Sequence, residues 1–223
     1  MLYSVTEPIK IDNPIEATAY MTDRPGQLLA RFYGYLGLSA LCADIPEHAN
    51  VLDMGSGASD LGHEVSRRRP DIRWTNFDAR YGSDEYPDDE KASIARMQAT
   101  APHNLTYVGG NVLSLPAQIT EQRYHRIFSY YMFPHVLDYC GKSAAFTAMR
   151  DTLGLLTPDG LLSTGPNRYR DDAWTAARSD YPSLRSMAAD MIQRYTESWK
   201  ASQKRLQSER SKKYPVHIGY PEV

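Results

Sequence analysis

One short stretch, residues 51–62, constrains the fold more than any other part of the sequence. An apolar pair is followed by an acid, then by two glycines with one residue between them, and then by the expected start of a helix (VLDMGSGASDLG). This order predicts a buried parallel strand, a tight turn and a helix N-terminus. Gly55 and Gly57 allow a sharp turn and a close approach of a ligand to the backbone. Because a helix N-terminus presents unpaired N–H groups, the stretch predicts a site for a polar small molecule.

The acidic residues narrow the class of ligand. A dinucleotide-binding turn has a third glycine three residues after the second, and here that position is Asp60. A second carboxylate, Asp53, lies at the end of the strand, and the sequence has no glycine-lysine-serine/threonine phosphate loop. Carboxylates beside a glycine turn favour a cationic ligand over a pyrophosphate. A dinucleotide-dependent oxidoreductase remains an alternative, and a comparison of NAD with other ligands would test it.

The stretch resembles motif I of the class I S-adenosylmethionine (SAM) methyltransferases, an acid followed by two glycines at alternate positions. In that family the acid end contacts the methionine moiety and the glycines pass under the cofactor. The resemblance implies that Asp53, Gly55, Ser56 and Gly57 bind SAM. It covers roughly residues 50–165 and implies an α/β fold with a doubly wound, mostly parallel sheet.

A second acid stands where such a fold meets a ribose. Residues 71–78 (DIRWTNFD) predict the second strand, with Asp78 at its tip. An acid about 20 residues beyond the glycine turn can accept hydrogen bonds from both ribose hydroxyls. Asp78 therefore resembles the motif II acid of the methyltransferases, and we place Ala79 beside it in the cofactor site.

The third strand and its turn, residues 104–113, predict an adenine contact. This segment, followed by Leu115-Pro116, resembles the family's glycine-aspartate-alanine segment, with Asn111 in place of the usual aspartate. An asparagine oxygen can still accept a hydrogen bond from the adenine amino group. Val112 is expected to pack on the adenine ring.

The fourth strand and its loop, residues 124–135 (YHRIFSYYMFPH), are aromatic-rich and end in a histidine. In the family this strand tip faces the transferred methyl group, so Tyr130 is assigned to the cofactor site. The acid-or-asparagine, double-proline and aromatic motif of amino-methylating enzymes is absent. His135 is a candidate general base for a hydroxyl or amine acceptor, because its unperturbed pKa lies near neutrality. The alternative is a histidine that caps the next helix.

The N-terminal region predicts a helical cap, residues 1–49, over the cofactor. Proline and turn signals bound one helix at 14–21 and a second at about 25–43. Helices ahead of motif I often cover the cofactor or substrate in this family. Tyr20 and Arg31 are candidates to reach the methionine end, Arg31 by pairing with its carboxylate.

The remaining elements fit one domain, residues 1–223, with a cofactor-binding core at 50–165 and a helical extension at 166–223. Helices are predicted at 59–69, 88–99, 142–156, 171–177 and 184–210. The Pro158-Asp159-Gly160 segment resembles the family's turn into the fifth strand, with Asp159 in place of the usual first glycine. Residues 214–220 are a candidate edge strand, since they contain glycine and proline. The antiparallel hairpin that usually ends this fold is therefore expected to be reduced.

Composition excludes several classes of protein. With 223 residues and a net charge of −2, the chain shows no general pull towards nucleic acid or anionic membrane. It has no membrane-length apolar run, no signal-peptide pattern and no metal-ligand spacing, and its two cysteines fit a reducing cytoplasm. The 191–215 segment carries seven basic and two acidic residues, which indicates either a solvated helix face or a contact for an anionic partner.

The resemblance implies a SAM-dependent methyltransferase that transfers a methyl group to an oxygen or nitrogen of a small molecule. An aromatic or natural-product metabolite is the expected acceptor, because the chain is rich in tyrosine, with 16 residues, and the amino-methylating motif is missing. No metal, membrane or nucleic-acid partner is expected, and a homodimer stays open. Besides the dinucleotide-dependent oxidoreductase, two alternatives remain: a SAM-binding regulatory or partner subunit without catalysis, and an RNA or protein methyltransferase that uses the basic C-terminal helix.

Overall fold

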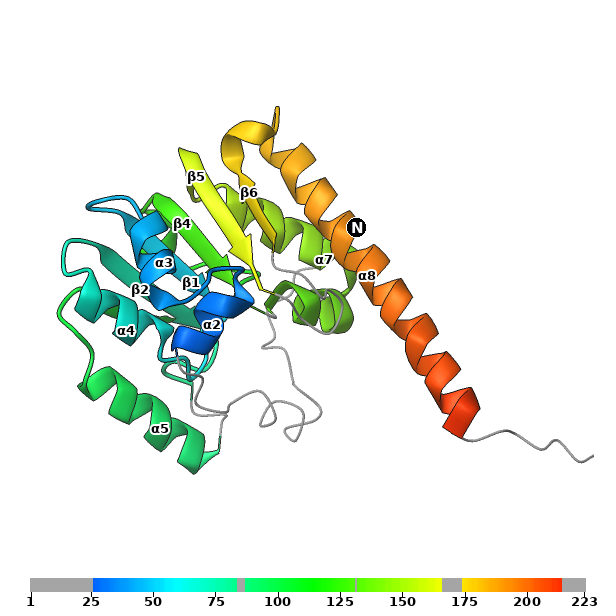
Figure 1. Cartoon of the computed structure of the whole chain (residues 1–223), viewed down its shortest axis with the longest axis horizontal. Coiled ribbons are helices and arrows are strands. Elements are labelled where there is room, and N and C mark those ends of the chain that lie inside the picture. The colour runs from blue at the N-terminus through cyan, green and yellow to red at the C-terminus, as the bar shows by residue number, and fades with distance from the viewer. Residues whose placement is uncertain (1–25, 84–86, 131, 166–173, 214–223) are drawn as a thin grey trace, which may run out of the picture.

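The computed structural model describes residues 26–83, 87–130, 132–165 and 174–213, and its centre is a six-stranded sheet (Figure 1). The strands lie in the order β3-β2-β1-β4-β5-β6. Their bounds are β1 Asn50–Met54, β2 Arg73–Asp78, β3 Leu105–Gly109, β4 Tyr124–Ser129, β5 Leu156–Thr164 and β6 Trp174–Ala177. The first five are mutually parallel, and β6 runs antiparallel to β5. The predicted α/β fold with a doubly wound, mostly parallel sheet is confirmed.

The strand order reverses at β1, which places the glycine turn at the sheet's switch point. β1 pairs with β2 on one side and with β4 on the other. Its residues Val51 to Met54 are buried, as expected for a parallel strand covered on both faces. In open α/β sheets, ligands bind beyond the carboxyl ends of the strands at such a point. The first candidate location is therefore the turn after Met54.

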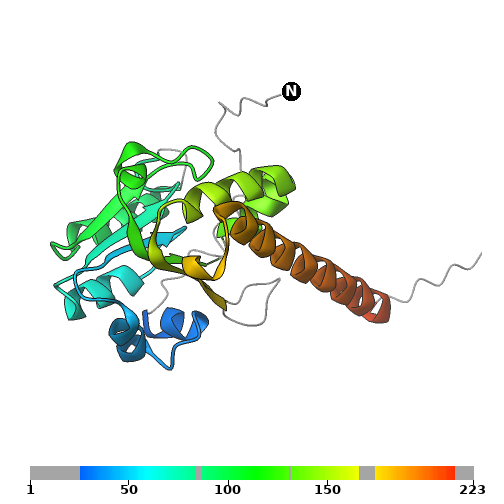
Figure 2. The same ribbon diagram turned by 90° about the horizontal axis from the view of Figure 1, so that it is seen from above.

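Helices cover both faces of the sheet (Figures 1 and 2). On one face, α2 Gly26–Phe32, α3 Leu38–Asp44 and α4 Leu61–Arg68 bury a core that includes Trp74 and Phe128. On the other, α7 Met132–Leu153 and α8 Leu184–Lys213 bury the larger core. Two further helices, α5 Asp88–Ala99 and α6 Ala117–Thr120, precede β3 and β4. The Trp74 and Phe128 rings stack across the sheet with centroids 5.6 Å apart.

The single helix predicted at 25–43 is wrong, because the chain forms two helices there, α2 and α3. Gly34 has φ 86°, a left-handed conformation that ends the first helix. Leu36, which lies inside the predicted helix, is 92% exposed in the segment between the two observed helices. Tyr33 instead packs its ring against Phe128.

The helix predicted at 171–177 is also wrong in its described part, where residues 174–177 form strand β6. The edge of β5 offers a ladder of backbone groups, and β6 pairs with it from Leu161↔Ala177 to Thr164↔Trp174. Pairing with this edge outweighs the local helix propensity of the alanines. Among the described residues one antiparallel strand follows β5, which agrees with the predicted reduction of the terminal hairpin.

The helix predicted at 142–156 begins ten residues earlier, as α7. Its first part, from Met132, is separated by Gly141, whose φ of 80° is non-helical, from a second part that ends at Leu153. The connection between β4 and α7 is consequently short, and His135 lies inside a helix. The helix predicted at 88–99 is confirmed as α5, while α4 is shorter than the predicted 59–69. The predicted helix at 14–21 and edge strand at 214–220 lie outside the described residues.

The last helix, α8, has a first part that packs on the body of the protein and a second part that projects from it. Met187, Ala188, Met191, Ile192 and Tyr195 are buried, and α8 packs mainly against α7. Beyond Tyr195 the helix continues to Lys213 and projects away from the sheet (Figures 1 and 2). Within the described residues, the structure has no helix both long enough and apolar enough to cross a membrane.

Candidate functional site

The turn after β1 has the shape that its two glycines predict. Gly55 and Gly57 have φ values of 75° and 55°, where a side chain is strained. The Gly55 N–H donates to the Phe77 carbonyl oxygen at 2.8 Å, which ties the turn to the end of β2. A Cβ added at Gly55 would lie 2.8 Å from Met132 Cβ, so the start of α7 packs directly on the turn. The strand ends and α7 thus meet around one backbone loop.

Asp78 lies against this turn, as the sequence predicts for the second acid. Its carboxylate is largely buried, and Oδ2 accepts the Gly57 N–H at 2.9 Å. Oδ1 accepts the backbone N–H of Arg80 at 3.0 Å. Each carboxylate oxygen can accept a further hydrogen bond. Asp78 can therefore hold the glycine turn in place and still offer acceptors to a ligand.

Tyr81 holds the glycine turn through its hydroxyl group. The sequence motifs do not predict this residue as part of the site. Its hydroxyl donates to the Gly57 carbonyl oxygen at 2.6 Å and lies 2.8 Å from Ser56 Oγ. Its ring packs edge-on against Tyr107 of β3. A side chain at Gly109 would collide with the Tyr81 backbone carbonyl, so β3 also presses closely on this segment. Burial raises the pKa of Tyr81 well above its usual value, which keeps its hydroxyl protonated as a donor.

Asp53 is a buried acid with no hydrogen-bond donor among the described residues. It is the penultimate residue of β1 and is 3% exposed. Burial, with a smaller effect from the Asp78 charge, raises the pKa of Asp53 to about 7. A carboxyl group held in this way gains from a cation that comes close to it. Asp53 is thus suited to the positive end of a ligand.

Replacing Asp53 with asparagine is expected to stabilise the ligand-free protein at pH 8. Between about pH 4 and pH 7 the unfolded chain ionises this carboxyl while the folded protein keeps it protonated, so folded-state stability falls as pH rises. The gain from Asp53→Asn should reach at most about 4 kcal/mol above pH 7, at about 1.4 kcal/mol per pKa unit, and vanish below pH 4.

Urea unfolding at pH 4, 6 and 8 checks this expectation, with Asp159→Asn on the exposed start of β5 as the matched control. The control should show the pH dependence of the parent protein. If Asp53→Asn also keeps the parent's pH dependence, the carboxyl of Asp53 does not titrate abnormally.

The predicted adenine and methyl-end residues lie beyond the neighbouring strands. The Asn111 amide oxygen accepts the Leu113 N–H at 2.9 Å, so it shapes its own turn and keeps one acceptor position. Val112, in the same turn, is half-buried against the larger core. Tyr130 follows β4 and stacks on Phe32 of α2 at 5.3 Å between ring centroids. That stack joins the N-terminal helices to the carboxyl end of the sheet.

The other predicted site residues are less fixed by the structure. His135 is half-buried in the first turns of α7, and its ring stacks on Tyr139 at 5.9 Å. Arg31 is exposed in the last turn of α2, and Ala79 is exposed in the turn after β2. Tyr20 lies outside the described residues. Their contacts with a cofactor or acceptor stay predictions.

Three polar residues that the sequence analysis passed over lie at the same end of the sheet. Arg80 has its Nε 3.8 Å from Asp78 Oδ1. Glu90, in the first turn of α5, and Ser129, at the tip of β4, are buried with no hydrogen-bond partner for their side chains among the described residues. Arg80 and Tyr81 come two and three residues after Asp78, the acid predicted to bind the ribose, and this position could have marked them as site residues. Nothing in the local sequence marks Glu90 or Ser129 as buried.

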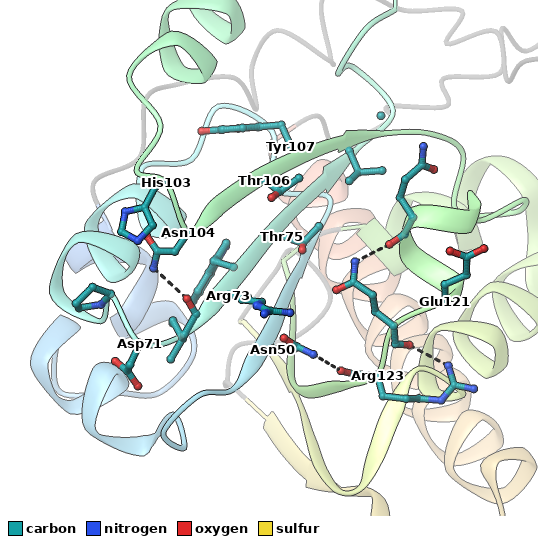
Figure 3. Close-up of a pocket in the computed structure, with 17 residues that line it drawn as sticks. Asn50, Asp71, Arg73, Thr75, His103, Asn104, Thr106, Tyr107, Glu121 and Arg123 are labelled. Carbon is teal, nitrogen blue, oxygen red and sulfur yellow. Dashed lines mark hydrogen bonds between the residues drawn. The ribbon is translucent and has the colours of Figure 1, made fainter.

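A groove of about 940 Å³ lies elsewhere, along the outer strands β2 and β3 (Figure 3). Polar side chains line it, among them Asn50, Arg73, Thr75, Thr106 and Glu121. None of the predicted site residues lines this groove. We give more weight to the strand ends, because the buried acids and the glycine turn are there. The described residues include no cluster of three or more histidine, cysteine or acidic side chains that could hold a metal ion.

No known family profile and no curated protein matches the sequence. Solved structures do match. Coclaurine N-methyltransferase bound to N-methylheliamine and SAH is 21% identical, with a TM-score of 0.43 over 57% of this chain and 34% of that one. The CcbJ methyltransferase from Streptomyces caelestis is 19% identical, with a TM-score of 0.45 over 62% and 47%. An O-methyltransferase family protein from Burkholderia thailandensis is 16% identical, with a TM-score of 0.44 over 62% and 37%. The matches span half or less of these proteins, and the likeness is one of fold.

Proposed function

We propose that the protein is a SAM-dependent methyltransferase that acts on an oxygen or nitrogen of a small molecule. The observation that carries this proposal is the convergence of Asp53, the glycine turn and Asp78 at the switch point of the sheet. Asp78 Oδ2 is bonded to the Gly57 N–H, and the Asp53 carboxyl lies close enough for the charge of Asp78 to raise its pKa. A ligand with a cationic end and a ribose fits this arrangement.

The residues present fit SAM at each part that they reach. Gly57 carries no side chain, and the group nearest to the place of its Cβ is the Arg80 guanidinium at 3.0 Å, so an adenosyl group could take that place close to the backbone. Asp53 is a buried carboxyl that has no hydrogen-bond donor in the part of the chain that the structure describes, and it suits the amino group and sulfonium of the methionine end. Asp78 keeps acceptor capacity for the ribose hydroxyls, and Asn111 keeps one acceptor position towards the adenine.

SAM supplies an electrophilic methyl group on a sulfonium. The protein's own contribution is to hold the acceptor in line and to exclude water, which in such reactions supplies much of the rate. His135 would remove the acceptor's proton if that acceptor is a hydroxyl. The stacked Phe32 and Tyr130 rings and the neighbouring Tyr33 offer an aromatic wall at the end of β4, which favours an aromatic acceptor.

The protein is expected to bind SAM and its demethylated product, S-adenosylhomocysteine, at micromolar affinity or better. Calorimetry should find one site per chain for each ligand, and NAD should give no heat because Asp60 stands where a dinucleotide turn has glycine. If SAM and S-adenosylhomocysteine at millimolar concentration give no binding heat and no thermal shift, the cofactor assignment is wrong.

The acceptor class needs a separate experiment with labelled SAM. The panel should hold aromatic alcohols, amines and natural-product metabolites, with RNA and protein as the remaining arms. Transfer to a small molecule supports the proposed function, and transfer to RNA or protein would replace its acceptor. Tight SAM binding without transfer to any acceptor would favour a regulatory or partner subunit. We also propose a cytoplasmic location, in keeping with two free cysteines, Cys42 and Cys140.

A further inference from the structure

The side chain of Arg80 lies across the glycine turn. Its Nη1 is 3.0 Å from the point that a Cβ on Gly57 would occupy. Its Nε lies 3.8 Å from Asp78 Oδ1, and both side chains are largely buried, at 17% and 10% exposure. The approach to the bare backbone of Gly57 is therefore taken by a guanidinium. A nucleoside that passes close to this turn has to displace it.

A second acid close by has no partner among the described residues. Glu90 lies in the first turn of α5 and is 5% exposed, and neither of its carboxylate oxygens has a hydrogen-bond partner in the described structure. Burial raises the pKa of Glu90, and the nearby charge of Arg80 opposes this rise. An unpaired buried carboxyl is costly, and it would gain from a guanidinium that turned towards it.

We propose that Arg80 switches partners when the cofactor binds, from Asp78 in the ligand-free protein to Glu90 in the complex. This inference rests on the proposed function and assigns a positioning role to two residues of the same site. In the ligand-free state Arg80 covers the turn and neutralises Asp78. In the bound state the Arg80–Glu90 pair leaves the acceptor capacity of Asp78 to the ribose hydroxyls.

The exchange has a clear energetic basis. Ligand binding can shift Arg80 only by as much as the ligand prefers the state in which Arg80 has left the turn, so any loss in the charge arrangement of that state lowers the affinity. Without Glu90, the displaced guanidinium would lose its carboxylate partner in a region of low exposure, and binding would carry that loss. With Glu90 present, one ion pair replaces another, and a buried acid that has no hydrogen-bond partner among the described residues gains a donor. Glu90 thus raises cofactor affinity without touching the cofactor.

A double-mutant cycle tests the switch, with calorimetric SAM titrations of the wild type, Glu90→Gln, Arg80→Met and the double variant. Glu90→Gln should weaken SAM binding about tenfold, the loss of one charge-assisted pair. Arg80→Met should bind SAM as tightly as the wild type or more tightly, because its side chain no longer competes for Asp78. In the Arg80→Met background, Glu90→Gln should change SAM affinity less than about twofold.

Two results would overturn the switch. A Glu90→Gln loss of the same size in both backgrounds would mean that Glu90 contacts the ligand directly. An unchanged affinity in Glu90→Gln would mean that Arg80 never uses Glu90. Asp89→Asn is the matched control, since Asp89 is an exposed acid in the same turn of α5, and it should bind SAM within about twofold of the wild type.

A stability measurement that needs no ligand guards against a purely structural effect. Glu90→Gln should leave the melting temperature of the ligand-free protein unchanged or raise it, because an unpaired carboxyl has been neutralised. A clear drop would show that Glu90 is already paired in the ligand-free state and would overturn the proposal. If the wild type fails to bind SAM at all, the proposed function falls. If the wild type binds and only the cycle fails, the switch alone falls.

Discussion

Replacing Asp78 with alanine is expected to weaken SAM binding about a hundredfold or more, since each charge-assisted hydrogen bond that is lost costs about 1.5–3 kcal/mol. Two bonds to the ribose hydroxyls are lost. The Gly57 N–H also loses its acceptor, Asp78 Oδ2, at 2.9 Å. The change therefore acts on the ligand and on the turn that carries it. Calorimetric titration with SAM and S-adenosylhomocysteine measures the effect.

Two variants separate the contributions of Asp78 from a general effect of removing acids. Asp60→Ala should weaken SAM binding only a few-fold, since a carboxylate beside the start of α4 contributes about 0.3–1 kcal/mol through the helix dipole. Asp78→Asn keeps an acceptor for the Gly57 N–H and should fall between the wild type and Asp78→Ala. Equal or reversed losses for Asp60→Ala and Asp78→Ala would show that the ribose does not lie at Asp78.

Replacing His135 with alanine is expected to lower turnover by about 10²–10⁴, the usual size of general-base assistance, if the acceptor is a hydroxyl. SAM affinity should stay within about threefold of the wild type, because the imidazole would face the acceptor. The helical position of His135, near the start of α7, is compatible with this role, since α7 begins against the glycine turn at Met132. Turnover and SAM binding are measured on the same preparation.

The outcome of the His135 experiment also reports on the acceptor. An amine that arrives neutral needs less help with its proton, so a small loss would point to nitrogen or to positioning alone. Unchanged turnover would remove His135 from the mechanism. Tyr139→Ala is the companion variant, because this half-exposed ring stacks on His135. If both variants lose stability and turnover in parallel, the histidine has a packing role.

The centre of the fold could be predicted because its signals are local. The β1 strand, the Gly55–Gly57 turn and Asp78 at the end of β2 each follow from a few adjacent residues, and the structure brings them together. The bounds predicted for the helix at 88–99 are likewise those of α5. In these places local preference and tertiary packing agree.

The errors fall where distant packing decides. The tail segment 174–177 is rich in alanine, and only the free edge of β5 makes it a strand. The break between α2 and α3 depends on Gly34 and on burial of Tyr33 against Phe128 of β4, about a hundred residues later in the sequence. Helical spacing alone could not show that Leu36 would be left in solvent.

The same limit applies to the site. Glu90 is one of three consecutive acids in the first turn of α5, and the local sequence gives no sign that it is buried near Arg80 while Asp88 and Asp89 are exposed. The Asn111 oxygen is predicted to accept a hydrogen bond from the adenine. In the structure it already accepts the Leu113 N–H, so one acceptor position is left for that contact. Residue type and spacing identified which groups could bind, and the folded geometry shows which other groups compete for them.

Because α8 projects from the body of the protein, a small change in its tilt produces a large displacement of its far end. Residues 196–213 continue the helix beyond Tyr195 by about 27 Å at 1.5 Å per residue. A tilt of about 10° about Tyr195 moves the far end by about 5 Å, although the buried contacts at the pivot shift by only a fraction of that distance. Small repacking between α7 and α8 is thus magnified at the tip. Conversely, a force applied at the tip acts on α7, the helix that carries His135 and packs on the glycine turn.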